Sequence, residues 1–165
     1  MDYLVNTDGG SRGNPGPAGF GFTISDGDGH LLLERAGFLG RATNNVAEYM
    51  AVVVALEEIG AADPSARVTV RADSKLVVEQ LSGSWKIKNA DLQQLALRAR
   101  RAHPPAQVRY VWVPRAENAA ADALANRAMD EQADYTRGQL TSRAGTGDDV
   151  GDERADGSGR AGAGG

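Results

Sequence analysis

The sequence contains no cysteine, few aromatic residues and no long apolar run. Without cysteine the chain can form neither a disulfide framework nor a thiolate metal site, and a reducing compartment is expected. No segment reaches the roughly 18 consecutive apolar residues that span a membrane, and no basic-then-apolar leader stands at the N-terminus. We therefore expect a soluble cytoplasmic protein, and 165 residues suffice for a domain with a buried core.

The formal net charge of -4 looks unfavourable for a nucleic-acid partner. The charge is unevenly distributed, however: residues 1–132 hold 14 Lys+Arg against 16 Asp+Glu, and residues 133–165 hold 4 Arg against 6 acids. Setting aside the four acids discussed below leaves residues 1–132 mildly basic. The overall charge therefore does not exclude an anionic partner.

Three strands joined by short turns are expected at the start of the chain. Residues 3–10 (YLVNTDGG) predict a strand that delivers Asp8 to its end, before a glycine pair. Residues 20–25 and about 30–39 predict two more strands, and the Asp-Gly-Asp-Gly turn between them indicates an antiparallel hairpin. Residues 11–19 are rich in turn formers and are expected to be a loop that can approach a ligand closely.

Helices and strands alternate in the remainder of the chain. Residues 46–59 are apolar nearly all round, which indicates a helix buried on most sides, with Thr43 or Asn44 as its cap. The later signals are, in order, strand, short helix, helix, strand and helix, at residues 67–72, 74–82, about 92–99, 107–113 and 118–131. The sequence thus predicts an α/β fold: a five-stranded mixed sheet, three antiparallel strands followed by parallel ones, with helices on both faces.

Residues 133–165 differ from the rest of the chain. From Gly138 onward nine of the 21 glycines occur, with almost no large apolar residue. Such a segment cannot bury enough apolar surface to offset the entropy lost on ordering. We expect one domain over residues 1–132, followed by a disordered tail or a linker cut from a longer protein.

Four acids occur where the expected elements could present them at one edge of the sheet: Asp8, Glu48, Asp73 and Asp122. Singly, Asp8 suits a turn, whereas Asp73 and Asp122 suit helix starts. Glu48 is more informative, because a charge among apolar neighbours must reach a partner or water. Mg²⁺ prefers carboxylate oxygens, and acids crowded without a metal would raise one another's pKa. Together the four acids indicate a divalent-metal site.

Four segments carry a resemblance to a known family: TDGGSRGNPGPAGFG, ATNNVAEYMAVVVAL, ADSKLVVEQLSG and VPRAENAAADALAN. In this order and spacing they resemble the type 1 ribonuclease H family, over roughly residues 1–132. The chain is similar to the short bacterial and archaeal branch, which lacks the extra basic helix of some members. Relatives with a similar N-terminal half are often fused, through a Gly/Ala-rich linker, to a histidine-phosphatase domain, and residues 133–165 would suit such a linker.

The resemblance implies a ribonuclease H-like fold in which Asp8, Glu48, Asp73 and Asp122 are catalytic and bind two Mg²⁺ ions. The family hydrolyses the RNA strand of RNA–DNA hybrids and leaves a 3′-hydroxyl and a 5′-phosphate. Two ions about 3.5–4 Å apart can activate a water and stabilise the leaving oxygen. Mn²⁺ is a possible substitute, since it also accepts oxygen ligands. The expected partner is an RNA–DNA hybrid duplex. The protein is expected to be a monomer and not to bind a membrane.

The resemblance also implies substrate contacts. The loop after the first strand would approach the RNA minor groove, where 2′-hydroxyls distinguish RNA from DNA, through Gly9, Gly10, Ser11, Arg12 and Asn14. In the family, certain positions contact the bases or sugars of the hybrid. The residues of this chain at those positions are Asn44, Asn45 and Gln80. The alternatives are helix capping for the two asparagines and a solvated helix face for the glutamine.

Two further sets of residues match backbone contacts. A pocket for a phosphate of the DNA strand is matched by Arg41, Thr43 and Asn89. A basic-aromatic patch suited to the nucleic-acid backbone is formed by Trp85, Lys86 and Lys88, although it could equally be a solvated turn with a packed indole.

One departure from the family pattern concerns histidine. Many members carry a histidine in the loop before the last helix, whereas here that loop is residues 114–118 (PRAEN). The two histidines, His30 and His103, are interpreted as surface residues. In place of that histidine, Arg115 of this loop is expected to contact a phosphate, as in the branch that the sequence resembles.

Three other functions compete with a hybrid-cleaving nuclease. A catalytically silent hybrid-binding module would be favoured by loss of one of the four acids, and none is lost. The TNNVAEY and glycine-rich segments argue against a junction resolvase or a proofreading exonuclease of the same superfamily, because those segments carry hybrid recognition. A nonhydrolytic structural protein is disfavoured by the charge of Glu48 inside an apolar helix. The residues do not decide whether RNA–RNA duplexes are also cut.

Overall fold

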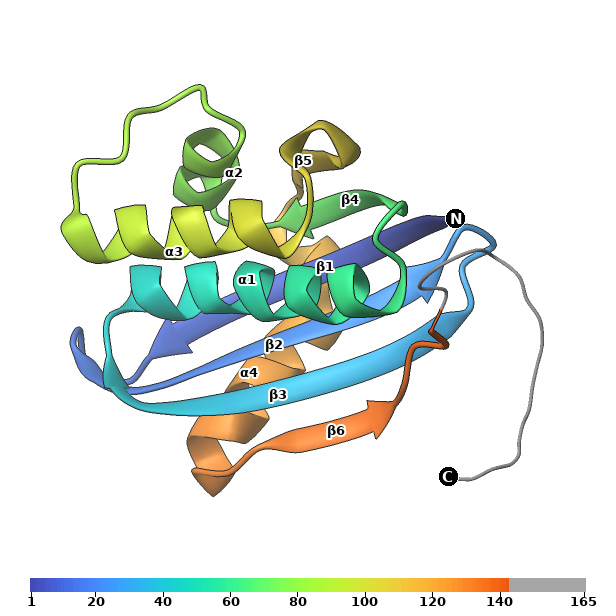
Figure 1. Cartoon of the computed structure of the whole chain (residues 1–165). Helices are drawn as coiled ribbons and strands as arrows, with labels where there is room; N and C mark the ends of the chain where they lie inside the picture. Colours follow the sequence, from blue (N-terminus) through green and yellow to red (C-terminus); the bar gives the residue numbers. More distant parts are fainter. Residues whose placement is uncertain (143–165) are drawn as a thin grey trace.

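The computed structural model describes residues 1–142. A sheet in the strand order β5-β4-β1-β2-β3-β6 lies at its centre (Figure 1). The strands are β1 (Asp2–Ser11), β2 (Gly16–Asp26), β3 (Leu31–Ala42), β4 (Arg67–Ala72), β5 (Val108–Trp112) and β6 (Tyr135–Gly138). β1 is parallel to β4 and β4 to β5, whereas the β1–β2, β2–β3 and β3–β6 pairs are antiparallel. The predicted mixed sheet is confirmed, with one strand more than expected.

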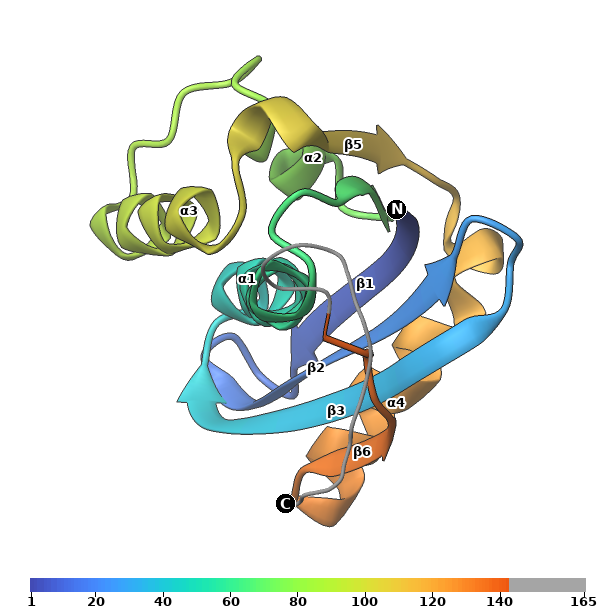
Figure 2. The ribbon, with the colours of Figure 1, turned by 45° about the vertical axis from the view of Figure 1, so that its right-hand side comes forward.

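Helices cover both faces of the sheet, as predicted. They are α1 (Asn44–Ala62), α2 (Lys75–Leu81), α3 (Ala90–Ala102) and α4 (Ala119–Glu131), with short 3-10 turns at Pro105–Gln107 and Arg115–Asn118. α1 lies on one face with α3 beside it, and α4 lies on the opposite face (Figure 2). Within residues 1–142, no helix combines the length and apolarity needed to cross a bilayer.

The main core lies between α1 and the sheet. Tyr49, Val53 and Leu56 of α1 are buried, which confirms the prediction of a helix enclosed on most sides. Because successive strand side chains point to opposite faces, Val5 and Val70 meet α1 from two neighbouring parallel strands. This packing fixes α1 over the strand that carries Asp8.

The second strand begins earlier than the sequence predicts. Residues 16–19 were expected to be loop, yet β2 begins at Gly16 and pairs with both β1 and β3. Glycine here permits close packing: a Cβ on Gly19 would lie 2.9 Å from Ala128 Cβ and 3.1 Å from Ala125 O. Gly19, which was expected in a turn-rich loop, thus lets the backbone of α4 approach the sheet.

The sixth strand corrects the predicted end of the ordered domain at residue 132. α4 ends at Gln132, which adopts a left-handed conformation with φ of 51°. Asp134 Oδ1 then accepts a hydrogen bond from Phe38 N at 2.8 Å, and β6 pairs with β3. Tyr135 packs against the small cluster around Ala36. A strand of four largely exposed residues has no alternating apolar pattern, so the sequence did not indicate it. Residues 143–165 of the predicted tail lie outside the described residues.

The interpretation of His103 as a surface residue is wrong. Its residue surface is 1 % exposed, and its Nε2 lies 2.6 Å from Ala66 O at the end of α3. The Pro-Pro pair that follows looked like a surface turn, but the chain there folds back onto the loop before β4. His30 is exposed, as predicted.

We predict that β6 contributes to the stability of the domain. A chain ending at Gln132 should have a free energy of unfolding lower by about 1–3 kcal/mol than a chain ending at Ser142, because the packing of Tyr135 is lost. The Arg127 guanidinium, 3.6 Å from the Tyr135 ring centroid, adds to this contribution. Urea unfolding of both chains measures the difference. Equal transition midpoints would show that the domain ends with α4.

Candidate active site

Three carboxylates from separate parts of the sequence meet at one edge of the sheet. Asp8 lies in β1, Glu48 in α1 and Asp73 directly after β4, and one ligand oxygen of each lies within 4.8 Å of the others. β1 and β4 are parallel neighbours in which Thr7 pairs with Ala72. The next residue of each strand is an acid, so the register itself brings Asp8 and Asp73 together.

Glu48 joins this pair because β1 and α1 are in backbone contact. A Cβ on Gly9 would lie 2.3 Å from the carbonyl carbon of Ala47 and 2.6 Å from Glu48 N. Only glycine leaves room for this approach. Gly9, predicted to contact substrate, therefore also sets the separation of two of the acids.

The fourth acid, Asp122, lies in the first turn of α4 and shares a side-chain hydrogen bond with Asp8. Just before this helix, the Asn118 side chain is buried and donates from Nδ2 to Thr7 O at 2.8 Å. Asn118 holds the cap position of α4 without a side-chain cap hydrogen bond. It instead fastens the start of α4 to the strand that carries Asp8.

Burial and repulsion make two of the acids, Asp8 and Glu48, reluctant to ionise. The pKa of Asp8 is raised to about 8, mainly by burial and in addition by the Asp73 charge and a hydrogen bond with Asp122. The pKa of Glu48 is raised to about 7, mainly by burial, although a hydrogen bond with Ser74 acts in the opposite direction. Ser74 also caps α2. The sequence did not single out Ser74 or Asn118, because neither differs from an ordinary helix-start residue until the tertiary contacts are known.

Asp73 has a buried oxygen without a hydrogen-bond partner, Oδ2. A buried, unpaired carboxylate oxygen is costly unless a cation occupies the space beside it. This oxygen forms a long ion pair with Arg115, whose Nε lies 3.8 Å from Asp73 Oδ2 and whose side chain is 84 % exposed. The donor set is therefore all oxygen, which fits Mg²⁺ or Mn²⁺.

The loop after Asp8 is fastened to the start of α1. Asn44 Oδ1 accepts hydrogen bonds from Ser11 N at 2.8 Å and Ser11 Oγ at 3.2 Å. Asn44 N donates in turn to Asn14 Oδ1 at 3.0 Å. Arg12 forms an ion pair with Asp130 of α4 at 2.5 Å. Gly10 lies within this segment, so five predicted contact residues are gathered where the segment after Asp8 meets the start of α1 and α4.

Capping accounts for two other predicted contact residues. Thr43 Oγ1 accepts from Val46 N at 3.2 Å and caps α1, which decides between the two predicted caps. Asn89 Oδ1 accepts from Leu92 N at 3.0 Å and caps α3. Arg41, at the end of β3, and Asn45 are both exposed. These four residues are thus placed at the ends of elements, where a nucleic-acid backbone can reach them.

Gln80 does not lie on a solvated helix face, and that alternative is wrong. The residue is 8 % exposed, and both ends of its amide are already bonded within the protein. Trp85 is 45 % exposed, and Lys86 and Lys88 are exposed beside it. The basic-aromatic patch is therefore open to solvent, whereas Gln80 lies behind it.

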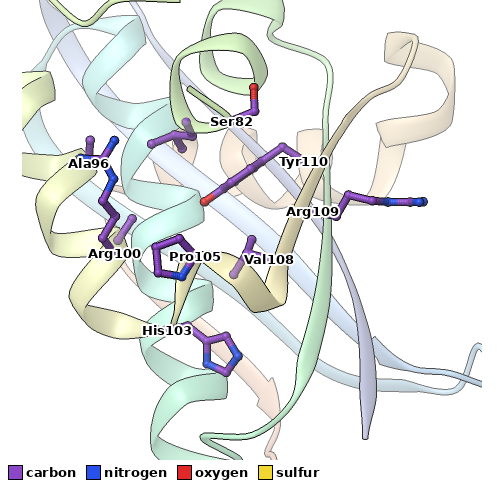
Figure 3. Close-up of a pocket in the computed structure, with 10 residues that line it drawn as sticks. Ser82, Ala96, Arg100, His103, Pro105, Val108, Arg109 and Tyr110 are labelled. Atoms are coloured by element: carbon purple, nitrogen blue, oxygen red, sulfur yellow. The ribbon is translucent and has the colours of Figure 1, made fainter. Parts of the chain in front are cut away.

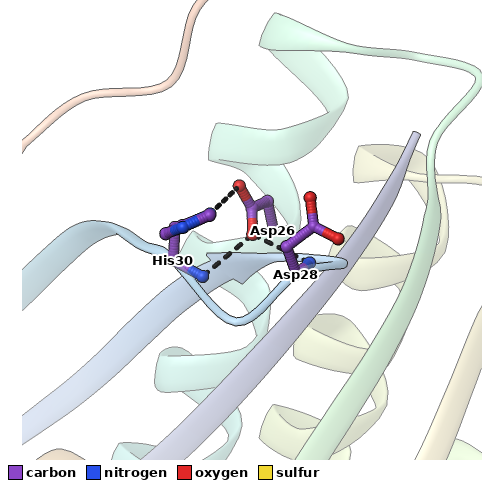
Figure 4. A group of neighbouring side chains, drawn as sticks. All are labelled: Asp26, Asp28 and His30. Atoms are coloured by element: carbon purple, nitrogen blue, oxygen red, sulfur yellow. Dashed lines mark hydrogen bonds and ion pairs between the residues drawn. The ribbon is translucent and has the colours of Figure 1, made fainter.

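Two other features of the described residues are separate from the acids. Asp26, Asp28 and His30 form a second acidic group at the β2–β3 turn (Figure 4). There Asp26 Oδ1 accepts the backbone N–H of Asp28 and His30, so the turn itself explains the group. A hollow of about 250 Å³ lies between α3 and β5, with Tyr110 pointing across it and Arg109 pointing away (Figure 3). None of the four acids lines it.

Comparison with known proteins agrees with this geometry. A family profile described as "Reverse transcriptase-like" matches residues 6–128. The chain is 47 % identical over 138 residues to a bifunctional protein of Mycobacterium tuberculosis, a match that covers 81 % of the chain and 37 % of that protein. It is 36 % identical to a ribonuclease H of Alcanivorax borkumensis, covering 79 % of the chain and 93 % of the relative.

Among solved structures, LC11-RNase H1 in complex with an RNA/DNA hybrid is 39 % identical to the chain. The TM-score is 0.73, and the match covers 79 % of this chain and 98 % of that one. The chain spans 37 % of the length of the M. tuberculosis relative, so the likeness concerns one part of that protein. The matches over residues 6–128 and the carboxylates gathered from β1, α1 and the end of β4 establish that the chain belongs to the type 1 ribonuclease H family.

Proposed function

We propose that the protein is an endoribonuclease that hydrolyses the RNA strand of RNA–DNA hybrids and leaves 3′-hydroxyl and 5′-phosphate ends. The observation that supports this most directly is the convergence of Asp8, Glu48 and Asp73 within 4.8 Å, with Asp122 hydrogen-bonded to Asp8. A module that only binds a nucleic acid has no need for such a costly group of acids, because carboxylates repel the phosphates of the duplex and weaken its binding.

Two Mg²⁺ ions fit the donor set of the site. Asp8, Glu48, Asp73 and Asp122 would hold them, and the unpaired Asp73 Oδ2 is an available ligand. When bound, the ions would supply an activated water and stabilise charge on the leaving oxygen. The protein's part is to fix the carboxylates before the substrate arrives, through the β1–β4 register and the contact at Gly9.

The surroundings of the acids suit a hybrid duplex. The Ser11–Asn14 loop, held by Asn44, offers short polar groups and backbone amides to the 2′-hydroxyls of an RNA strand. Arg41, Thr43 and Asn89 would bind a phosphate of the DNA strand. The solved complex of LC11-RNase H1 with a hybrid makes this substrate the natural one to test.

Arg115 is proposed to contact a phosphate of the substrate near the reacting centre. Its side chain is 84 % exposed, and its Nε lies 3.8 Å from Asp73 Oδ2, so the guanidinium can bridge the metal site and a duplex.

The decisive test is the cleavage of end-labelled 20–30-mer RNA–DNA, RNA–RNA and DNA–DNA duplexes in Mg²⁺, Mn²⁺ or EDTA. We expect Asp73→Asn to reduce hybrid cleavage by roughly a hundredfold or more, because a metal ligand is lost. Asp91→Asn, which changes an exposed acid in the first turn of α3, is the matched control and should cleave normally. Wild-type protein that binds the hybrid without cutting it in either ion would instead be a binding module.

The stability of the metal-free protein should depend on pH in a direction set by the raised pKa values. Asp8 and Glu48 bind protons more tightly in the folded than in the unfolded state, so the free energy of unfolding in EDTA should fall as pH rises from about 4 to about 8. Mg²⁺ should restore stability most at the upper end of this range. Urea titrations with EDTA or Mg²⁺ measure both trends. In Asp8→Asn, the free energy of unfolding in EDTA should depend less steeply on pH. A steeper dependence in this variant would contradict a raised pKa at Asp8.

A methyl group on Gly9 should separate the acids without removing one. We expect Gly9→Ala to weaken Mg²⁺ binding and to slow cleavage about tenfold or more, because the new Cβ would overlap the backbone of α1. Gly10→Ala is the matched control, since its Cβ would have its nearest neighbour at 3.7 Å. Calorimetric titration with Mg²⁺ compares the two variants. Equal affinities would mean that α1 can shift without disturbing the site.

A further inference from the structure

The connection between α2 and α3, residues 82–89, contains neither helix nor strand. It carries the exposed Trp85, Lys86 and Lys88, and it leads to the cap residue Asn89. In Figure 1 this connection lies on the same side of the molecule as the start of α1 and the end of β1. The loop that carries the exposed Trp85, Lys86 and Lys88 therefore lies at the same end of the molecule as the start of the helix that carries Glu48.

Only part of this loop is supported by apolar packing. Ile87 packs against the main core, whereas Trp85, Lys86 and Lys88 are exposed. A hollow of about 310 Å³ lies between the loop and α3, lined by Trp85, Ile87 and Arg100 among others. One apolar anchor therefore leaves the position of Trp85 and Lys86 dependent on hydrogen bonds.

Two glutamine amides provide those bonds. Gln80 Nε2, from α2, donates to Lys86 O at 3.1 Å, and Gln93 Nε2, from α3, donates to Ile87 O at 2.7 Å. Consecutive carbonyls of the loop are thus held from two different helices. The backbone of Trp85 is held as well, since its N–H donates to Glu79 O at 2.9 Å.

The Gln80 amide is itself held by α1. Its Oε1 accepts a hydrogen bond of 2.6 Å from the hydroxyl of Tyr49, which is fully buried and follows Glu48 in the helix. Glutamine suits this place because its amide can accept from a phenol and donate to a carbonyl at the same time. The bonds connect the loop to the helix that carries a catalytic acid.

We propose that Tyr49, Gln80 and Gln93 are positioning residues for hybrid binding. They hold Trp85 and Lys86 at a fixed place relative to Glu48, so the loop need not be ordered when the duplex binds. This inference rests on the proposed function, and it gives Gln80 a role behind the contact surface in place of the predicted contact with bases or sugars.

The test compares kcat and KM for a hybrid substrate in variants that break one or both bonds of the Gln80 amide. Gln80→Met, Gln80→Glu and Tyr49→Phe should raise KM roughly tenfold and change kcat little, because each leaves a buried group unpaired and the loop free. Gln80→Glu is informative because its carboxylate can still accept from Tyr49 but cannot donate to Lys86 O. The Mg²⁺ dependence of cleavage should stay as in the wild type.

Surface variants guard against effects of misfolding. Gln93 is exposed, so Gln93→Met should fold normally and still raise KM, whereas Gln94→Met, on the neighbouring exposed residue, should not. Gln107→Met removes a different amide that bonds Pro64 O and Ala66 O, and it should lower stability without changing KM. Hydrogen exchange at residues 84–88 should accelerate in the Tyr49, Gln80 and Gln93 variants and stay unchanged in the Gln94 and Gln107 variants.

The outcomes separate this inference from the proposed function. If the wild type neither binds nor cuts hybrids, the proposed function fails, whatever the exchange data show. If the wild type cuts hybrids and the Gln80 and Gln93 variants exchange faster but keep the wild-type KM, the loop is ordered for another reason and the inference is overturned. An unchanged exchange rate in both variants would overturn it directly.

Discussion

Repulsion among buried carboxylates is the constraint on which the rest of the structure depends. Asp8 and Glu48 lose solvation where they meet Asp73, and the charge of Asp73 raises the pKa of both. No exposed loop could hold such groups together, because it would move until they separated. The cluster is stable only because every member is attached to an element whose position is fixed by the main core, and the cost is offset by apolar burial far from the site.

Three backbone relations transmit that stability to the acids. The parallel register of β1 and β4 pairs Thr7 with Ala72, so the acids that follow them, Asp8 and Asp73, lie side by side. The absence of a side chain at Gly9 lets α1 contact β1. Asn118 fastens α4 to the carbonyl just before Asp8. Each relation joins main chain to main chain or through one short side chain, so little conformational freedom remains. The separation of the acids is therefore a property of the sheet and not of the residues' own rotamers.

Much of this arrangement could be predicted from the sequence, because periodicity and composition report on the elements themselves. The apolar run around Val53 and the strand before Asp8 fall where expected. The errors share a cause, which is that glycine, histidine and short polar strands have no local pattern. Gly19 looks like a turn residue until α4 is placed against it, and His103 looks exposed until the loop before β4 closes over it. β6 depends on the Asp134 bond to β3, which is a tertiary contact.

The role of Gln80 could not be predicted from the sequence. A glutamine beside a substrate surface can either touch the substrate or hold the surface in place, and only its burial distinguishes the two roles. Here the loop after β1 is fastened to α1 through Asn44, and the loop after α2 is fastened to the same helix through Tyr49. Glu48 lies between these two residues. One rigid helix therefore serves as the common reference for both candidate contact surfaces and for the acids, so a duplex held by the loops meets carboxylates whose position is already set.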